Sequence, residues 1–282
     1  MRKRISFISV LTMFLAIGFV IIFSRPVKAA ANGVILKANR TYTAYDVTGD
    51  GMKDKIRIRA ANQTDDEAYA SLTVSVNGKT AYRLKNTRFY NVIANIYTLK
   101  NGQPFLYLYA PADNGDGPVC ALLKYTNGKF KKILDFTEIM AGYGNHRIGE
   151  VTNLNGNKIV ITESIVSYSL GINAINFTYK YVNGKFVPTS RYGSYKEIYS
   201  ADGSSRYFTV NSNLLAYTRL GATAVNTILK TGSLTKIIKC ALISGKMYIQ
   251  LECDGEIYWI KALENPPISD SERQFMEVRY AG

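Results

Sequence analysis

Five of the seven Asn-Gly pairs in the chain recur at nearly constant intervals of 24, 26, 28 and 28 residues. The pairs begin at Asn77, Asn101, Asn127, Asn155 and Asn183. Asn-Gly between two strands is a strong hairpin signal, because both central residues of a type I′ turn need positive φ. The spacing therefore predicts repeated antiparallel hairpins over residues 31–200, arranged either as propeller-like blades or as an open meander.

The residues between these pairs are typical of strands. The chain has 21 Tyr and 12 Phe and is rich in Val, Ile and Thr, which suit a pleated, half-buried surface. In the segment 55–59, isoleucines alternate with charged residues as in a strand with one buried face. We therefore expect an all-β protein. The one exception is the tail, residues 264–282, where Ser269 and Glu272 have capping-box spacing and predict a short helix.

The N-terminus has the three parts of a secretory signal. A cluster of three basic residues is followed by an uncharged run over 5–23 and by small residues at 29–31. An uncleaved anchor is the alternative, because nineteen mostly apolar residues are long enough to span a bilayer. In both cases the remaining chain lies outside the cytoplasm. The sequence thus predicts a signal peptide over residues 1–30 and a secreted protein that touches the membrane only through this segment.

The exported part is basic. The chain has a formal charge of +14, and residues 1–30 contribute five of these positive charges and no negative one, which leaves about +9. Such a protein is attracted to anionic polymers, including wall polymers, acidic glycans and released nucleic acid. Because the Lys and Arg residues are scattered along the chain, solubility is the other interpretation of this charge. We predict no specific nucleic-acid binding.

Three cysteines are too few for a disulfide framework. Cys240 and Cys253 lie on two strand-like segments and are the only plausible pair by position. The other interpretation is that they are small buried apolar residues, as free cysteines often are. Secreted proteins that depend on disulfides usually carry more of them, which favours this second interpretation.

The sharpest local motif is the segment 46–54, which places oxygen-bearing side chains at loop positions 1, 3, 5 and 9 and glycine at position 6. Calcium binds six to eight oxygens, and the glycine permits the sharp reversal that aims them at one point. Position 12 is Arg57 rather than the Glu of an EF-hand, so a loop opening a β-hairpin fits better. The predicted ligands for Ca²⁺ are the side chains of Asp46, Thr48, Asp50 and Asp54 and the carbonyl of Met52.

This loop resembles the calcium loop of FG-GAP or VCBS-type β-repeats, in which the metal lies between two strands. The resemblance implies the same ligand positions here, although Thr48 replaces the more common Asn or Asp. An acidic turn without metal is the alternative. A second segment, 113–118, has similar turn chemistry. It has Ala112 and Cys120 at the aligned positions 1 and 9, and we interpret it as a turn.

Residues 205–263 resemble bacterial SH3-like domains. The resemblance rests on the segments 229–232, 246–250 and 254–261. It implies a small β-barrel that holds the protein on cell-wall peptide or glycan, with Tyr258 and Trp259 as candidate contact residues. The alternative is a barrel without a ligand, in which Trp259 belongs to the core.

The sequence contains no clear catalytic motif. His146 is the only histidine, so a His-based zinc site cannot form, and Cys120 lies in an apolar segment unsuited to a reactive thiolate. A hydrolase with a carboxylate pair from Glu138, Glu150 or Glu163 stays an alternative, because distant acids can meet in a fold. Our main prediction is a non-catalytic surface protein that binds a cell-wall polymer or an extracellular protein. A structural spacer is the third alternative.

Overall fold

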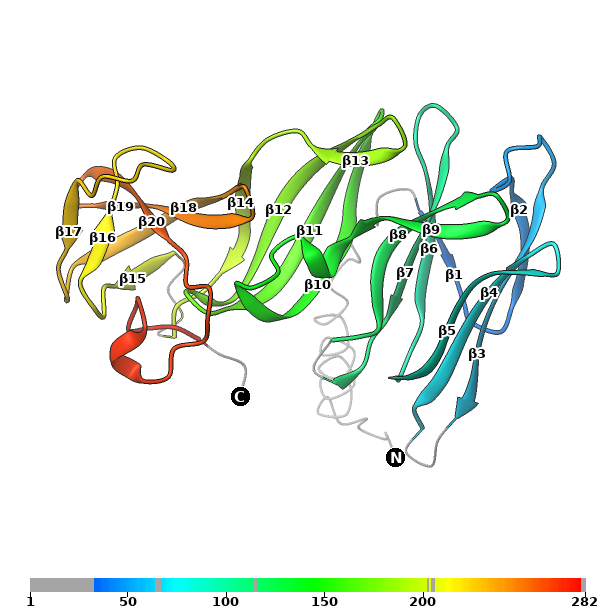
Figure 1. Cartoon of the computed structure of the whole chain (residues 1–282), viewed down its shortest axis with the longest axis horizontal. Coiled ribbons are helices and arrows are strands. Elements are labelled where there is room, and N and C mark those ends of the chain that lie inside the picture. Colours follow the sequence, from blue (N-terminus) through cyan, green and yellow to red (C-terminus); the bar gives the residue numbers. More distant parts are fainter. Residues whose placement is uncertain (1–32, 64–66, 114–115, 202, 204–205, 280–282) are drawn as a thin grey trace, which may run out of the picture. The chain divides into compact units, whose positions relative to one another are not determined.

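The computed structural model describes residues 33–63, 67–113, 116–201, 203 and 206–279 (Figure 1). The expected signal peptide therefore lies outside the described residues. The described part consists of β-strands and two short 3₁₀ helices and contains no α-helix, which confirms the all-β prediction. No helix in this part is long and apolar enough to cross a membrane.

Most strands belong to three antiparallel sheets. A four-stranded sheet has the order β2-β3-β4-β5, and a five-stranded sheet has the order β1-β6-β7-β8-β9. The four-stranded sheet comprises β2 (Thr41–Tyr45), β3 (Asp54–Gln63), β4 (Tyr69–Val76) and β5 (Lys79–Phe89). The five-stranded sheet comprises β1 (Val34–Leu36), β6 (Ile93–Thr98), β7 (Pro104–Ala110), β8 (Val119–Thr126) and β9 (Lys129–Asp135).

The third sheet has nine strands, seven of them in the order β10-β11-β12-β14-β18-β19-β20, with β13 paired to β12 and β15 to β18. Its strands are β10 (Gly144–Asn155), β11 (Lys158–Ser167), β12 (Gly171–Val182), β13 (Lys185–Pro188), β14 (Tyr192–Ile198), β15 (Tyr207–Thr209), β18 (Leu234–Ile243), β19 (Lys246–Cys253) and β20 (Glu256–Lys261). A separate ribbon pairs β16 (Leu214–Ala216) with β17 (Thr227–Leu229).

Each of these five Asn-Gly pairs lies at a connection between two paired strands, as the spacing predicted. At Asn77, Asn127 and Asn183 both the asparagine and the following glycine have positive φ, about 50° and 80°, as a type I′ turn requires. At the other two pairs only the glycine has positive φ. The repeated antiparallel hairpins are therefore confirmed, and they form open meanders.

The centre of the five-stranded sheet is buried on both faces. Along β7 every residue from Phe105 to Ala110 is buried. Leu106 and Leu108 belong to a core cluster with side chains of the four-stranded sheet, such as Ile58. Phe105, Tyr107 and Tyr109 point to the other face, into the cluster that contains Phe177 of β12. Alternation thus sends aliphatic residues to one core and aromatic residues to the other.

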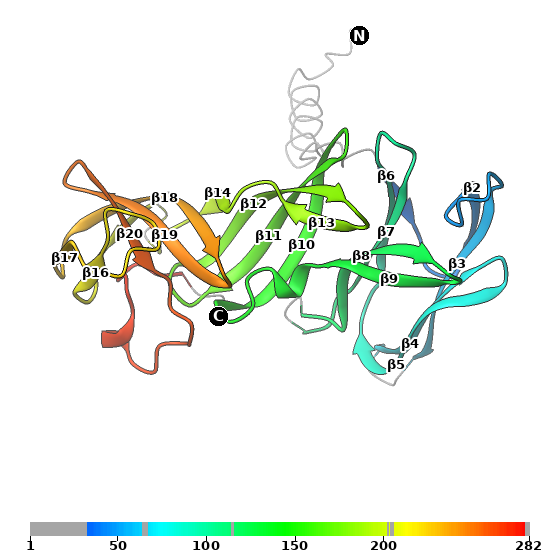
Figure 2. The same ribbon diagram turned by 45° about the horizontal axis from the view of Figure 1, so that its top comes forward.

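Of the strands expected to form an SH3-like barrel, β15, β18, β19 and β20 continue the nine-stranded sheet (Figure 2), and only β16 and β17 lie outside it. β14 pairs with β18, with Gly193 opposite Cys240. A β-carbon at Gly193 would lie 2.6 Å from Phe177 Cε1 and 2.8 Å from Cys240 Sγ, so only glycine allows this close packing. The described strands form no closed barrel, so the closed small barrel expected over residues 205–263 is absent from them.

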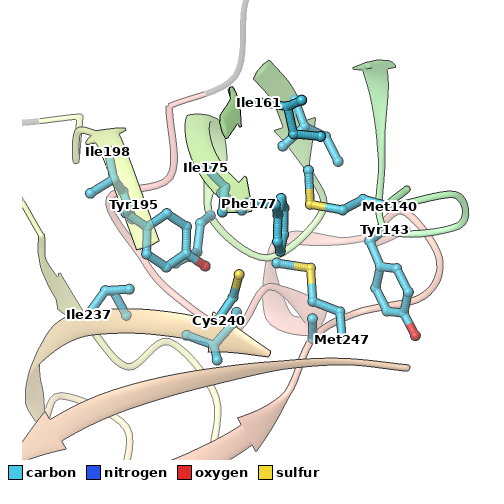
Figure 3. Packing of buried hydrophobic residues seen from close by; sticks show 14 of the residues in the cluster. Met140, Tyr143, Ile161, Ile175, Phe177, Tyr195, Ile198, Ile237, Cys240 and Met247 are labelled. Atoms are coloured by element: carbon cyan, nitrogen blue, oxygen red, sulfur yellow. The ribbon is translucent and has the colours of Figure 1, made fainter. Parts of the chain in front are cut away.

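Side chains from both sides of this junction share one core. Figure 3 shows Phe177 and Tyr195, from β12 and β14, beside Cys240 and Met247, from β18 and β19. Cys240 and Cys253 are both free and buried. In the β18–β19 register Cys240 lies opposite Ile249 and Cys253 opposite Thr235, which separates the two thiols along the sheet.

The C-terminal tail contains one 3₁₀ turn, Asp270–Glu272, in place of the expected helix. Ser269 occupies the N-cap but makes no side-chain capping bond. The Glu272 carboxylate accepts a hydrogen bond from the backbone N–H of Ile268 at 2.8 Å, one residue before the position that a capping box uses. The capping signal therefore marks a turn and not a full helix.

We predict that Gly193→Ala destabilises the protein by about 1–3 kcal/mol, because the added methyl group overpacks the β14–β18 junction. Urea unfolding measures this loss. Ser194→Ala is the matched control, since Ser194 is the exposed neighbour on the opposite face, and we expect a change within about 0.5 kcal/mol. Equal stability of the two variants would contradict the close packing of Gly193 at the β14–β18 junction.

Candidate functional site

The predicted calcium loop connects β2 to β3 and folds around the carboxylate of Asp46. Asp46 Oδ1 accepts a hydrogen bond from Gly49 N at 2.6 Å, and Oδ2 accepts one from Gly51 N at 2.8 Å. Both glycines have φ near +80°, which favours glycine at these positions. Desolvation raises the pKa of Asp46, but the hydrogen bonds from Gly49, Gly51 and Thr48 outweigh it and hold the pKa below its ordinary value.

Asp54 anchors the same loop from the start of β3. Its carboxylate is buried, and Oδ2 accepts hydrogen bonds from Val47 N at 2.7 Å and Thr48 N at 2.9 Å. Oδ1 accepts a 2.6 Å bond from the side-chain amide of Asn77, in the β4–β5 turn. Asp54 thus ties the loop to a neighbouring hairpin, a structural role that does not require a metal.

The donor atoms of the loop are only partly gathered for a cation. Thr48 Oγ1 lies 3.2 Å from Asp46 Oδ1 and 3.3 Å from Asp54 Oδ1, so one hydroxyl and two carboxylates converge. Asp50 Oδ1 instead accepts a hydrogen bond from Met52 N at 2.8 Å. Within the described residues, no three His, Cys, Asp or Glu side chains meet at one position. The oxygen donors suit a hard cation chemically, but a complete cage requires Asp50 to turn inward.

The second acidic turn is held by its backbone. Ala112 N donates to Asp116 O at 2.5 Å, and Asp116 N donates to Asp113 O at 3.2 Å. The Asp116 carboxylate lies 3.1 Å from Nδ1 of His146. The only histidine of the chain therefore faces this acidic residue.

The two candidate contact residues on β20 are largely covered. Trp259 is 5% exposed and packs with Tyr217 and Tyr248 in a small cluster, while Tyr192 stacks on it with ring centroids 6.1 Å apart. Tyr258 is half-buried and packs against the main core. The ring of Trp259 therefore occupies a core position.

The carboxylates considered for a hydrolase do not gather into one site. In the β10–β11 register Gly149 lies opposite Glu163, and Glu150 lies opposite Thr162, so the two glutamates point to opposite faces. Glu150 is exposed and lies 3.9 Å from the Lys196 ammonium. Glu138 ends the 3₁₀ helix Phe136–Glu138, which precedes β10.

The Cys120 thiol is buried, and burial raises its pKa to about 12. Its sulfur lies 3.4 Å from the carbonyl oxygen of Gly149 and donates a hydrogen bond to it. The same carbonyl accepts a 2.8 Å hydrogen bond from the Tyr107 hydroxyl. At neutral pH the thiol is protonated, so it lacks the thiolate that a nucleophile needs.

Glu163 is the most unusual carboxyl group of the described structure. Its side chain is fully buried, and neither oxygen has a hydrogen-bond partner. A β-carbon at Gly149 would lie 2.3 Å from Glu163 Oε1, so the carboxyl group occupies the space above this glycine. Burial raises its pKa well above the ordinary value, while the charge of Arg147 lowers it and that of Asp135 raises it. Burial without hydrogen-bond partners therefore favours the protonated form of Glu163.

Two features were missed in the sequence, and the first is the burial of Glu163. Glu163 follows Ile159 and Ile161 at alternate positions of one strand, which places it on the inward face. The second feature is a basic face on the four-stranded sheet. Arg59 lies opposite Thr73, and Thr73 lies opposite Arg83. The alternation in β3 is visible in the sequence, but the register that adds Arg83 is not.

No family model matches this chain, and neither the curated proteins nor the solved structures contain a significant match to it.

We predict that Asp54→Ala costs about 3 kcal/mol of stability in the presence of a chelator, because it leaves the buried N–H of Val47 and the amide of Asn77 without their acceptor. Asp50→Ala should cost less than about 1 kcal/mol under the same conditions, since Asp50 is exposed and accepts only the bond from Met52. Denaturant titration compares them. Equal losses would show that Asp54 is not the anchor.

We predict an unusual pH dependence from Glu163. Because its folded pKa is raised, the folded state holds this proton more tightly, and stability from this group is lost as pH rises from about 4.3, the unfolded value, to the folded pKa. The slope is at most about 1.4 kcal/mol per pH unit. The measurement is the difference in unfolding free energy between wild type and Glu163→Gln at pH 5 and pH 8. It should decrease with pH, and a constant difference would refute a neutral Glu163.

Proposed function

We propose that this chain is an exported, non-catalytic binding protein whose four-stranded sheet is stabilised by Ca²⁺ at the β2–β3 loop. The observation that supports this best is the convergence of Asp46 and Asp54 on the hydroxyl of Thr48. Carboxylate and hydroxyl oxygens are ligands that calcium accepts, and the loop already holds two carboxylates in place.

Calcium would change the position of the third carboxylate, that of Asp50. Asp50 would leave its bond to Met52 N and turn toward the other acids, and the Met52 carbonyl would supply a further oxygen. Three carboxylates held close together repel each other, and a divalent cation removes this repulsion. Calcium would therefore stiffen the β2–β3 connection, at one end of the sheet that carries the basic face.

The partner in this proposal is a cell-wall polymer or an extracellular protein. The predicted export segment and the charge of about +9 outside it support an anionic partner at the cell exterior. A hydrolase that uses Glu150 and Glu163 together has less support, because the two side chains point to opposite faces of the sheet. The proposal does not rest on Tyr258 or Trp259, since the Trp259 ring is covered.

We predict that 5 mM Ca²⁺ raises the melting temperature by about 3–6 °C relative to chelator. A dissociation constant of roughly 0.5 mM, in the extracellular range, gives about 1.4 kcal/mol of stabilisation, and a domain of this size shifts by about 2–4 °C per kcal/mol. Asp50→Ala should abolish the shift, while Asp113→Ala, in the second acidic turn, should retain it. A full shift in Asp50→Ala, or no shift in wild type, would remove calcium from the proposal.

A further inference from the structure

The outer face of the four-stranded sheet is a continuous basic surface. Its strands alternate between buried apolar residues and exposed cations, and three cations of β3 and two of β5 point outward. We call this surface the basic face. It consists of Lys55, Arg57, Arg59, Arg83 and Lys85.

Cross-strand register arranges these cations as a grid. Arg59, Thr73 and Arg83 lie side by side across β3, β4 and β5, and Lys85 lies opposite Ser71 on the next outward position. Neighbouring cations on one strand are therefore about 6.7 Å apart, and the two cationic strands are about 9.6 Å apart. Small hydroxyl residues of β4 fill the row between them. The resulting depression has a volume of about 420 Å³, and its lining includes Arg59, Thr73, Arg83 and Lys85.

The basic face has no acidic counterpart within its own strands. The only acidic residue of β2–β5 is Asp54, whose buried carboxylate is bound by the loop. Among the described residues, none of the five cations forms an ion pair with an acidic side chain. The like charges along one strand lie about 6.7 Å apart and repel each other, which costs stability. An external polyanion would neutralise this repulsion, so the surface is suited to bind one.

The spacing and the residue types point to phosphate groups on a linear chain. Arginine matches phosphate with two parallel N–H bonds, and three of the five cations are arginine. Phosphates joined through a three-carbon polyol are six backbone bonds apart. This is twice the span of one extended peptide residue, or about 7 Å. Successive phosphates would therefore reach successive cations of one strand.

The side chains of the basic face argue against a nucleic acid. Proteins that bind single strands stack the bases on aromatic rings beside the cations. The outward positions of the β3–β5 grid hold alanine, serine and threonine, and Tyr82 lies opposite Val74, on the inward face. We infer that the basic face binds a linear polyol-phosphate polymer. This inference rests on the proposed function, because it names the anionic partner of the same exported sheet.

Binding of a defined poly(glycerol phosphate) at 50 mM salt tests the inference. Arg59→Ser/Arg83→Ser should bind about tenfold more weakly, and its salt dependence should fall by about 1.4–1.8 in log–log slope if each arginine contacts one phosphate. Arg191→Ser/Arg219→Ser is the matched control, because it removes two exposed arginines outside the four-stranded sheet. It should bind as wild type does. Thermal unfolding confirms that both double variants are folded.

Three outcomes would overturn the inference. Wild type could fail to bind the polymer, the two double variants could lose affinity equally, or duplex or single-stranded DNA could bind as tightly as the polymer. Equal losses would mean that only net charge matters. The same titration in chelator and with Asp50→Ala separates the two proposals. If the polymer binds but calcium does not change the melting temperature, only the calcium proposal fails. If calcium shifts the melting temperature but the polymer does not bind, only the inference about the basic face fails.

Discussion

The rest of the structure depends on the double-sided burial of the five-stranded sheet. β7 and β8 have no solvent face along most of their length, so each residue contributes to one of two cores. Leu106 and Leu108 face the four-stranded sheet, and Phe105 and Tyr107 face β10–β12. Full burial of one such side chain contributes about 1.5–3 kcal/mol. A change in these strands therefore affects both neighbouring sheets at once.

The sequence predicted what is local and missed what is distant. Asn-Gly turns and the alternation of apolar and polar residues depend on neighbouring residues. The hairpins and the all-β class could therefore be predicted from the sequence. The pairing of β14 with β18 joins segments about 45 residues apart and depends on the missing side chain of Gly193, for which the sequence holds no local signal. For this reason the C-terminal strands were interpreted as a separate barrel, although they extend an existing sheet.

The same distinction applies to the sites. The loop 46–54 was recognisable because its oxygen donors lie within nine residues, and the structure brings Asp46, Thr48 and Asp54 together. The basic face was not recognisable, because Arg59 and Arg83 meet only through the register of three strands. Trp259 was considered as a contact residue because of the resemblance to SH3-like domains. Tyr192 and Tyr217, which cover its ring, precede it in the sequence by more than 40 residues.

The pairing of β1 with β6 has a consequence for the order of folding. Val34 lies opposite Ile96, so this ladder closes a loop of about sixty residues that contains the whole four-stranded sheet. The hairpins of that sheet have local contacts and form early, whereas a long loop closes slowly. The first strand of the chain must therefore wait until β6 is available. During synthesis, β1 could pair only after residue 98 has emerged, and the first two sheets would consolidate together, as one unit, only after residue 135.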